Sequence, residues 1–160
     1  MACLLPFLIA AIMGVVDCLV GLDLAGALTI TNYQCIKNAG NSFVIVRAFA
    51  STGVIDPAAT QSLTNAKAVG LATDVYMFPC RGKNAATQAD QLIDGIPANL
   101  YTNIWIDVEN NPSPGCSWAS FDTASNCKFL TDIITRFRSY GKSVGVYSST
   151  FMWANIFGGK

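Results

Sequence analysis

Two carboxylates close an otherwise apolar segment in the second half of the chain. Residues 104–110 read IWIDVEN, so Asp107 and Glu109 are two positions apart. Side chains at positions i and i+2 of a strand point to the same face, and two neighbouring buried acids raise the pKa of one of them. A protonated acid beside an ionised one is the pair that cleavage of a glycosidic bond requires. We therefore predict acid–base chemistry on a sugar, with a helix cap or a calcium site as structural alternatives.

The composition restricts the other chemistry that is open to the chain. Its 160 residues include ten basic and ten acidic side chains and no histidine. Without histidine, Ser-His-Asp and Cys-His catalysis and most catalytic zinc sites are excluded. A net charge of zero gives no reason to expect nucleic acid as a partner. No Gly-rich phosphate loop follows the first predicted strand, and we expect no metal and no organic cofactor.

The first residues form an apolar run. Residues 1–18 are MACLLPFLIAAIMGVVDC, which is shorter than the roughly 20 residues of a membrane span. A secretory signal peptide fits this run best, although no basic residue precedes it, and a buried N-terminal helix or an uncleaved anchor are the alternatives. Cleavage near residue 18 would leave one domain over 19–160, with no membrane association. Exported chains use their cysteines in disulfides, and the remaining ones are Cys35, Cys80, Cys116 and Cys127.

Apolar strands and helical segments alternate along the rest of the chain. We predict strands over residues 20–26, 43–49, 72–79, 103–110 and 143–149. Each predicted strand is followed by a predicted helix. These helices cover 29–40, 57–70, a segment from about 84, 120–140 and 150–157. This alternation is typical of parallel βαβ units. It allows a doubly wound open sheet or a barrel, and the small number of units alone slightly favours the open sheet.

In such folds, ligands bind at the carboxyl ends of the strands. Glu109 stands at the end of the fourth strand, and Asp23 stands near the end of the first. Tyr76 on the third strand and Tyr147 on the fifth offer aromatic rings, which suit the apolar faces of sugars. We expect these side chains to surround one site.

The strand segments together are more specific than the acid pair. GLDLAG, FVIVRAF, DVYMFP, IWIDVEN and VGVYSS, in this order, resemble glycoside hydrolase family 25 over about residues 20–158. These are the Chalaropsis-type lysozymes, or N-acetylmuramidases, and the eukaryotic branch is most similar. The resemblance implies an α/β fold, a flattened TIM-barrel-like (β/α) structure. Because family members are longer, it also implies an incomplete barrel of about five to six parallel units that lacks the C-terminal strands and the aspartate they carry.

The resemblance also implies roles for the acids. Glu109 matches the general acid/base of the family. Asp107 matches the acid that orients and stabilises the 2-acetamido group of the substrate, which attacks the anomeric carbon as an internal nucleophile. Asp23 matches a third acid, on the first strand.

Several other residues match positions of the family. Tyr76 and Tyr147 match tyrosines and are predicted to contact substrate, although Met77 stands where the family has histidine. Arg47 matches a basic residue of the second strand and is expected to be structural. Trp105 is expected to fill the barrel interior.

One disulfide is predicted near these acids. Cys116 and Cys127 bracket a loop rich in Pro, Ser and Gly that follows the fourth strand. We predict that they pair and hold this loop. Cys80 is the rival partner, because the third strand ends at the same rim, and the absence of C-x-x-C spacing argues against zinc.

These observations favour a lysozyme-type muramidase that hydrolyses β-1,4 bonds between N-acetylmuramic acid and N-acetylglucosamine in bacterial peptidoglycan. The expected location is extracellular or lysosomal and phagosomal. A truncated, non-catalytic peptidoglycan-binding protein is the first alternative. The second is a glycosidase in which Asp107 itself attacks the sugar.

Overall fold

The computed structural model describes residues 19–158, and the predicted signal peptide lies outside this range. Its strands are β1 (Gly21–Leu24), β2 (Phe43–Ala50), β3 (Val54–Ile55), β4 (Ala72–Met77), β5 (Asn103–Asp107) and β6 (Ser143–Tyr147). Its α-helices are α1 (Ile30–Asn38), α2 (Ala59–Ala68), α3 (Ala85–Gly95), α4 (Thr123–Ser139) and α5 (Thr150–Phe157), and short 3-10 turns cover Ala98–Leu100 and Trp118–Ser120. The five predicted strands and five predicted helices are all present; β3 and the 3-10 turns were not predicted.

The five long strands form a parallel sheet in the order β1-β2-β4-β5-β6, and β3 pairs antiparallel with β2. Each new parallel strand is therefore added on the same side of the one before it. With right-handed crossovers, this single direction of winding places all connecting helices on one face, as in a barrel. Within residues 19–158 the sheet remains open, with β1 and β6 at its two ends. The barrel-type interpretation is confirmed, and the doubly wound alternative is wrong.

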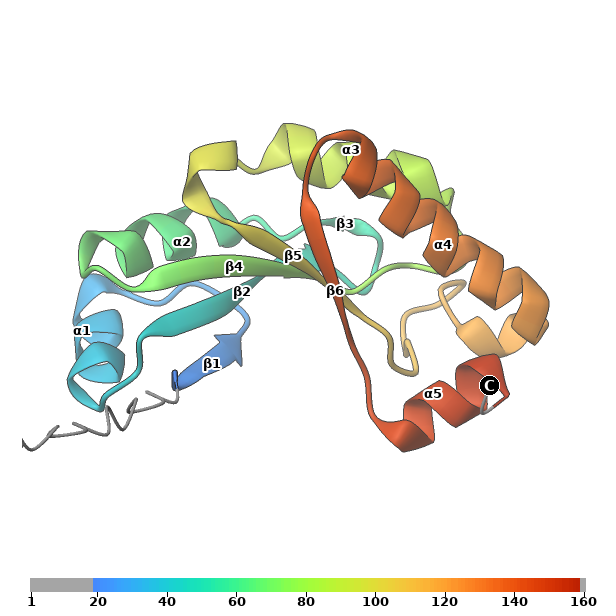
Figure 1. Cartoon of the computed structure of the whole chain (residues 1–160), viewed down its shortest axis with the longest axis horizontal. Coiled ribbons are helices and arrows are strands. Elements are labelled where there is room, and N and C mark those ends of the chain that lie inside the picture. Colours follow the sequence, from blue (N-terminus) through green and yellow to red (C-terminus); the bar gives the residue numbers. More distant parts are fainter. Residues whose placement is uncertain (1–18, 159–160) are drawn as a thin grey trace, which may run out of the picture.

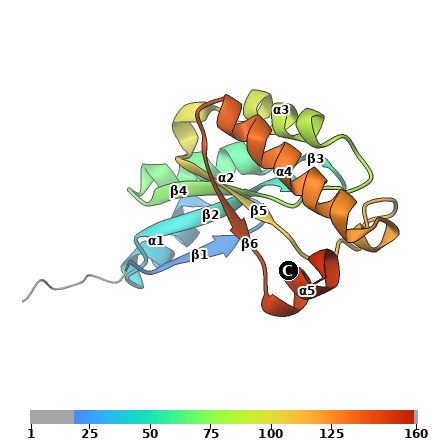
Figure 2. The ribbon, with the colours of Figure 1, turned by 45° about the vertical axis from the view of Figure 1, so that its right-hand side comes forward.

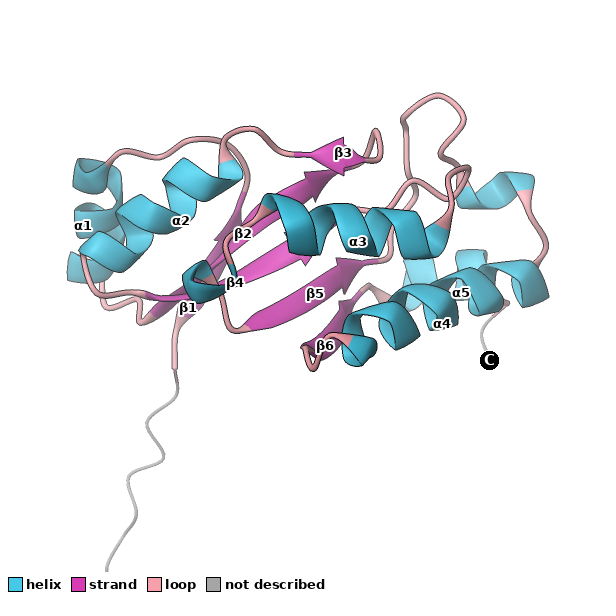
Figure 3. Ribbon diagram, turned by 90° about the horizontal axis from the view of Figure 1, so that it is seen from above, coloured by secondary structure: helices cyan, strands magenta, loops and turns pink. Residues whose placement is uncertain are grey.

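The helices cover one face of this sheet. In Figure 1, α2, α3 and α4 lie together above the strands, and Figure 3 shows them side by side from above. Helix α1 packs beside α2, where the hydroxyl groups of buried Tyr33 and Ser62 are 2.6 Å apart. Under these helices lie Ile104 and Ile106 of β5 and Val108 directly after it, all with no exposed surface. This layer is the hydrophobic core of the described chain.

Polar side chains set the start of most helices. Thr29 caps α1 with a capping box, and Asn84, Asp122 and Ser149 accept hydrogen bonds from the first turns of α3, α4 and α5. Each satisfies a backbone N–H that has no partner within its helix. Helix α5 does not join the others; it lies below the N-terminal end of α4 in Figures 1 and 2, where Phe157 meets the buried ring of Trp118 at 5.9 Å.

A disulfide joins the loops that follow β4 and β5, and it corrects the predicted pairing. Cys80 bonds to Cys116, the rival partner, whereas Cys127 is an exposed thiol in α4 with no disulfide partner among the described residues. The reason is topological. Neighbouring parallel strands end at the same rim, so Cys80 and Cys116 meet there with their Cα atoms 4.3 Å apart, while α4 carries Cys127 away into solvent.

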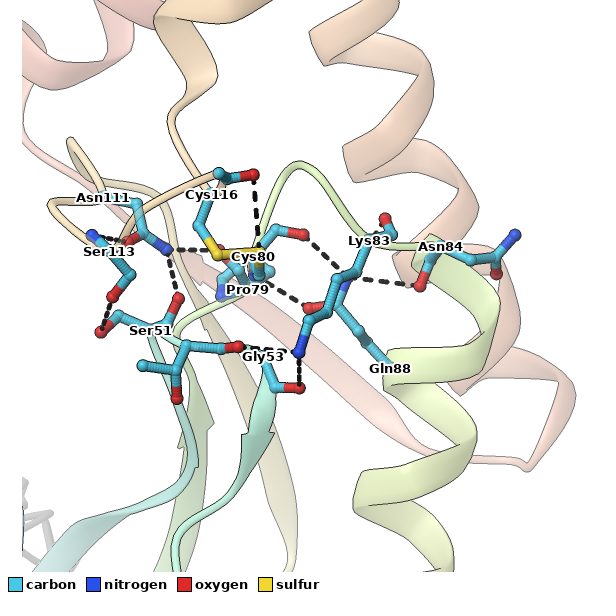
Figure 4. The surroundings of a disulfide bond; sticks show 12 residues. Ser51, Gly53, Pro79, Cys80, Lys83, Asn84, Gln88, Asn111, Ser113 and Cys116 are labelled. Atoms are coloured by element: carbon cyan, nitrogen blue, oxygen red, sulfur yellow. Dashed lines mark hydrogen bonds between the residues drawn. A yellow bond between two sulfur atoms is a disulfide. The ribbon is translucent and has the colours of Figure 1, made fainter.

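Hydrogen bonds extend this contact across the rim (Figure 4). The side-chain amide of Asn111 donates to the carbonyls of Ser51 at 2.8 Å and Pro79 at 3.0 Å. The amide of Gln88 donates to the Cys80 carbonyl at 3.0 Å and accepts from the Cys80 N–H at 2.8 Å. The loops after β2, β4 and β5 are thereby tied together, and the last of them contains Glu109.

No helix within residues 19–158 has the length and apolar character that crossing a bilayer would need.

Candidate active site

The face of the sheet opposite the helices carries a cleft of ≈520 Å³. A cleft of this size can hold a ligand of a few hundred daltons. All five strands of the parallel sheet contribute to its walls, and most of the lining side chains are aromatic or acidic. The lining residues are Gly21, Leu22, Asp23, Phe43, Ile45, Arg47, Tyr76, Phe78, Trp105, Asp107, Glu109 and Tyr147.

This cleft brings together every predicted catalytic and substrate-binding residue. Asp23, Tyr76, Asp107, Glu109 and Tyr147 come from four different strands or the turns after them, and all five line it. Asp23 and Tyr147 are exposed at its two ends, and the side chain of Glu109 is half-buried. The alternation of β5 explains the acid pair, because Ile104, Ile106 and Val108 take the helix-covered face and leave the cleft face to the other residues.

Asp107 has the most unusual environment in the cleft. It is 9% exposed, and its Oδ1 atom has no hydrogen-bond partner among the described residues. Burial, followed by the negative charges of Glu109 and Asp23, raises the pKa of Asp107 from 3.8 to about 7. Leaving a buried polar atom unpaired costs about 1–3 kcal/mol. The fold therefore maintains, in the wall of the cleft, a carboxyl group that is still partly protonated at neutral pH.

Tyr76 belongs to the same electrostatic cluster. Burial raises the pKa of its phenol; the positive charge of Arg47 lowers it, and the charges of Asp107, Asp23 and Asp56 raise it. The phenol is therefore within electrostatic range of Arg47 and of the acids Asp107 and Asp23, and it remains protonated at neutral pH. A neutral hydroxyl in this place can donate a hydrogen bond to a sugar oxygen.

Trp105 lies on the cleft face and is held in place by two neighbours. Its indole N–H donates to the carboxylate of Asp74 at 3.0 Å, and this carboxylate also accepts from the backbone and side chain of Asn103. On the next strand Gly145 lies directly under the ring, since a Cβ atom there would approach within 2.5 Å of it. Trp105 was predicted to fill the barrel interior. Its ring does lie on the face of the sheet opposite the helices, but it lines an open cleft there.

Arg47 was matched to a family position from the sequence, whereas Asp74 was not. Alternation along β4 places Asp74 on the cleft face, but its contact with Trp105 depends on the pairing with β5. Arg47 donates through Nε to Asp56 at 2.8 Å. Asp56, whose other oxygen accepts the Ala58 N–H before α2, thus also anchors a cleft residue. Phe43, Ile45 and Phe78 complete the apolar lining, and the alternating pattern of their strands is the signal that could have identified them.

A second hollow, of ≈610 Å³, lies between α3 and α4. Its cations already have protein partners: Lys83 donates to the carbonyls of Thr52 and Gly53, and Lys128 pairs with Asp132. Arg136 pairs with Asp90, and Arg81 donates through Nε to the side-chain oxygen of Asn126 at 2.9 Å. In the described part of the chain, no group of three or more histidine, cysteine, aspartate or glutamate side chains is arranged to hold a metal ion. The carboxylates of the cleft are thus the strongest candidates for catalytic groups.

Comparison with solved structures defines the class of fold. The family GH25 lysozyme from Aspergillus fumigatus superposes with a TM-score of 0.74 at 21% identity, over 86% of this chain and 68% of that one. The muramidase from Acremonium alcalophilum gives a TM-score of 0.74 at 20% identity, over 86% and 69%. The open sheet described above is therefore the β/α scaffold of these glycoside hydrolases.

Comparison of sequences defines the family. The family model described as Lysozyme-like protein 1 matches residues 16–160. Lysozyme-like protein 5 of Caenorhabditis elegans is 35% identical over 86% of this chain and 64% of its own length. Probable GH family 25 lysozyme 2 of Dictyostelium discoideum is 35% identical over 93% of this chain and 69% of its own. The chain belongs to the lysozymes of glycoside hydrolase family 25, and it spans roughly half to two thirds of the length of such relatives.

Proposed function

We propose that the chain hydrolyses the β-1,4 bonds between N-acetylmuramic acid and N-acetylglucosamine in bacterial peptidoglycan. Membership of the lysozyme family supports the reaction class. The observation that carries the proposal is Asp107: a buried carboxyl with a pKa of about 7 and an unpartnered oxygen, beside Glu109 in an open cleft. Its biological purpose would be digestion of bacteria or defence against them.

In this proposal the two acids have different roles. Asp107 is protonated below about pH 7, so it is a poor nucleophile in the free cleft. The carboxylate of Asp107, which lines the cleft, can accept the N–H of the substrate's 2-acetamido group, and that hydrogen bond favours the ionised form. The displaced proton passes to the neighbouring Glu109. Glu109 then protonates the leaving oxygen while the acetamido oxygen attacks the anomeric carbon, as the resemblance implies.

The residues around the acids have supporting roles. Asp23 maintains the negative field that keeps a proton on the pair. Tyr76 and Tyr147 contact the sugar, the first through its hydroxyl and the second through an exposed ring at the edge of the cleft. Because Asp107 loses its proton above about pH 7, activity should fall as the pH rises through this value.

A paired substitution tests the proposal. Glu109→Gln removes the proton donor with little change in shape, whereas Asp94→Asn makes the same chemical change on the exposed surface of α3. Release of reducing ends from purified Gram-positive walls should fall about 10²- to 10⁴-fold in Glu109→Gln and stay unchanged in Asp94→Asn. Equal release by wild type and Glu109→Gln would remove Glu109 from the mechanism. If a covalent glycosyl-enzyme were trapped on Asp107, the mechanism would be direct attack by Asp107 and not substrate assistance.

We also propose that the chain is exported, to the outside of the cell or to lysosomes and phagosomes. The apolar run at residues 1–18 and the Cys80–Cys116 disulfide both support an oxidising route. N-terminal sequencing of the chain recovered from the medium of expressing cells should give a start near residue 19. Recovery only inside cells, with residues 1–18 retained, would contradict export.

A further inference from the structure

The cleft has a single cation among its lining residues, Arg47. Three acids, Asp23, Asp107 and Glu109, line the same cleft. A substrate that bears a negative charge would be repelled by them unless a positive group received that charge. The surroundings of Arg47 decide whether its guanidinium is available for this role.

Arg47 is anchored at one end and open at the other. Its Nε donates to Oδ2 of Asp56 at 2.8 Å, and the second oxygen of Asp56 accepts the Ala58 N–H at 3.0 Å. The Asp56 side chain is 6% exposed, whereas that of Arg47 is 34% exposed. Guanidinium has five N–H donors, and this bond uses one of them. Neither Nη group has a hydrogen-bond partner among the described residues, so a pair of parallel donors is left over.

Regular alternation with Phe43 and Ile45 places Arg47 on the cleft face, and an irregularity in β2 follows directly after it. Arg47 is opposite Tyr76 on β4, but Phe49 is opposite Met77, so Ala48 is an extra residue on β2. Beyond this bulge the alternation changes, because Ala48 and Phe49 are both fully buried. Bulges redirect side chains in this way and are frequent beside binding sites. The strand thus buries Phe49 while Arg47 remains on the cleft face.

The positive end of the Arg47–Asp56 pair faces the cleft. At the Tyr76 phenol, the charge of Arg47 lowers the pKa by more than the charge of Asp56 raises it. Sheet register also fixes the distance to the acids: Arg47, Tyr76 and Trp105 are partners on three consecutive strands, and Asp107 is two residues beyond Trp105. The Cα atoms of Arg47 and Asp107 are therefore separated by about 10 Å across the sheet and about 7 Å along it. A glycan bound at the acids would have its adjacent sugar within reach of Arg47.

We propose that the free edge of the Arg47 guanidinium binds a carboxylate carried by the glycan, and so selects acidic over neutral polysaccharide. This inference rests on the proposed function of the same cleft. A planar fork that is held at Nε and open at both Nη groups matches the two oxygens of a carboxylate. Peptidoglycan offers such a group in two places: the lactyl substituent of N-acetylmuramic acid in peptide-free strands, and the stem peptide attached to it.

Four substrates separate these sources. They are peptide-free oligosaccharides of alternating N-acetylglucosamine and N-acetylmuramic acid, their lactyl methyl esters, the same oligosaccharides with stem peptides, and neutral chitin oligosaccharides. The proteins are wild type, Arg47→Gln, Arg47→Lys, and Arg138→Gln as the matched control, since Arg138 is exposed on α4. Arg47→Lys retains a charge for Asp56, so a stable protein remains available if Arg47→Gln folds poorly.

Wild type should cleave the free acid at least about tenfold more efficiently than its methyl ester or chitin. Arg47→Gln should lose this preference, mainly through a higher KM for the acid, and Arg47→Lys should retain part of it. If the preference of wild type is for the peptide-bearing strands instead, the carboxylate is that of the stem peptide. Arg138→Gln should behave as wild type. An equal loss on acid and ester in Arg47→Gln would make Arg47 structural and overturn the inference.

A binding measurement separates this inference from the proposed function. Titration calorimetry with Glu109→Gln, with and without Arg47→Gln, gives the ratio of Kd values for acid and ester without turnover. A ratio of about ten that disappears with Arg47 supports the inference even if wild type hydrolyses none of the four substrates, a result that would reject only the proposed function. Hydrolysis by wild type with a ratio of one overturns the inference alone.

Discussion

The two faces of the parallel sheet are made by the same strands, yet they differ in almost every physical property. On the helix-covered face, Ile104, Ile106 and Val108 have no exposed surface, and these apolar side chains need no hydrogen-bond partners. On the cleft face, the alternate residues of the same segment are Trp105, Asp107 and Glu109. Of these, Asp107 has an unpartnered oxygen and a raised pKa. The helix-covered face stabilises the fold, whereas the cleft face lowers this stability because it keeps ionisable groups partly buried.

This division follows from the winding of the chain. Because each parallel strand is added on the same side, all crossover helices cover one face and leave the other to the ligand. Polar groups on the second face are therefore placed by strand register rather than by packing. Substitutions on the helix-covered face should accordingly affect stability most, and substitutions of polar groups on the cleft face should affect activity most.

The largest effect on stability is expected from Ile106→Ala, on the helix-covered face. Loss of a fully buried isoleucine side chain should lower the free energy of unfolding by about 2–5 kcal/mol. The matched change Ile45→Ala, on the half-buried cleft face, should cost about 1 kcal/mol because less surface leaves water and less of a cavity remains. Urea denaturation measures both. Equal losses would show that the cleft face is packed as tightly as the core.

A smaller effect of opposite sign is expected from Asp107→Asn. The pKa of Asp107 in the folded chain, about 7, exceeds its ordinary value of 3.8, so the folded state retains a proton that the unfolded state releases. The free energy of unfolding of wild type should therefore decrease as the pH rises from about 4 to about 7 and stay constant above. The neutral amide avoids this loss, although its own N–H donors are imperfectly matched. The variant should gain about 2 kcal/mol at pH 8.

At pH 3, where Asp107 is protonated in both states, this gain should disappear, and wall hydrolysis by the variant should be lost at every pH. Urea denaturation at pH 3, 5 and 8 provides the measurement, and Asp94→Asn should show no gain at any of them. A gain that is the same at pH 3 and pH 8 would mean that charge burial is not its cause.

The smallest effect on stability is expected from Tyr147→Ala. The side chain is 57% exposed at the end of β6, so the free energy of unfolding should change by less than about 0.5 kcal/mol. If the ring contacts the sugar, KM for wall oligosaccharides should rise several-fold with kcat nearly unchanged. An unaltered KM would remove Tyr147 from the binding site and restrict the cleft to its inner residues.

The fold and the grouping of the candidate residues in one cleft follow from the sequence, because both depend on local patterns. Alternation within IWIDVEN was sufficient to place Asp107 and Glu109 on one face, and the order of strands and helices gave the parallel sheet. The two-residue strand β3 was missed, since so short a segment has no periodicity to detect.

Contacts between distant segments could not be predicted in the same way. The pairing of Cys80 with Cys116 depends on which loops meet at the rim, and the nearer cysteine in sequence was the wrong choice. The anchoring of Arg47 by Asp56 and of Trp105 by Asp74 depends on the register between strands. The sequence likewise indicated that one acid of the pair would have a raised pKa, but only burial identifies Asp107 as that acid.

The location of the disulfide has a consequence for how the chain reaches this structure during oxidation. Cys80 and Cys116 are 36 positions apart, whereas Cys127 is only 11 positions beyond Cys116. In an unstructured chain the shorter loop closes with an advantage of about 1 kcal/mol, so random oxidation favours the non-native bond. The native bond becomes the preferred one only after β4 and β5 are neighbours. Its formation therefore reports that the middle of the sheet has assembled, and Cys127 is the thiol that competes with it until then.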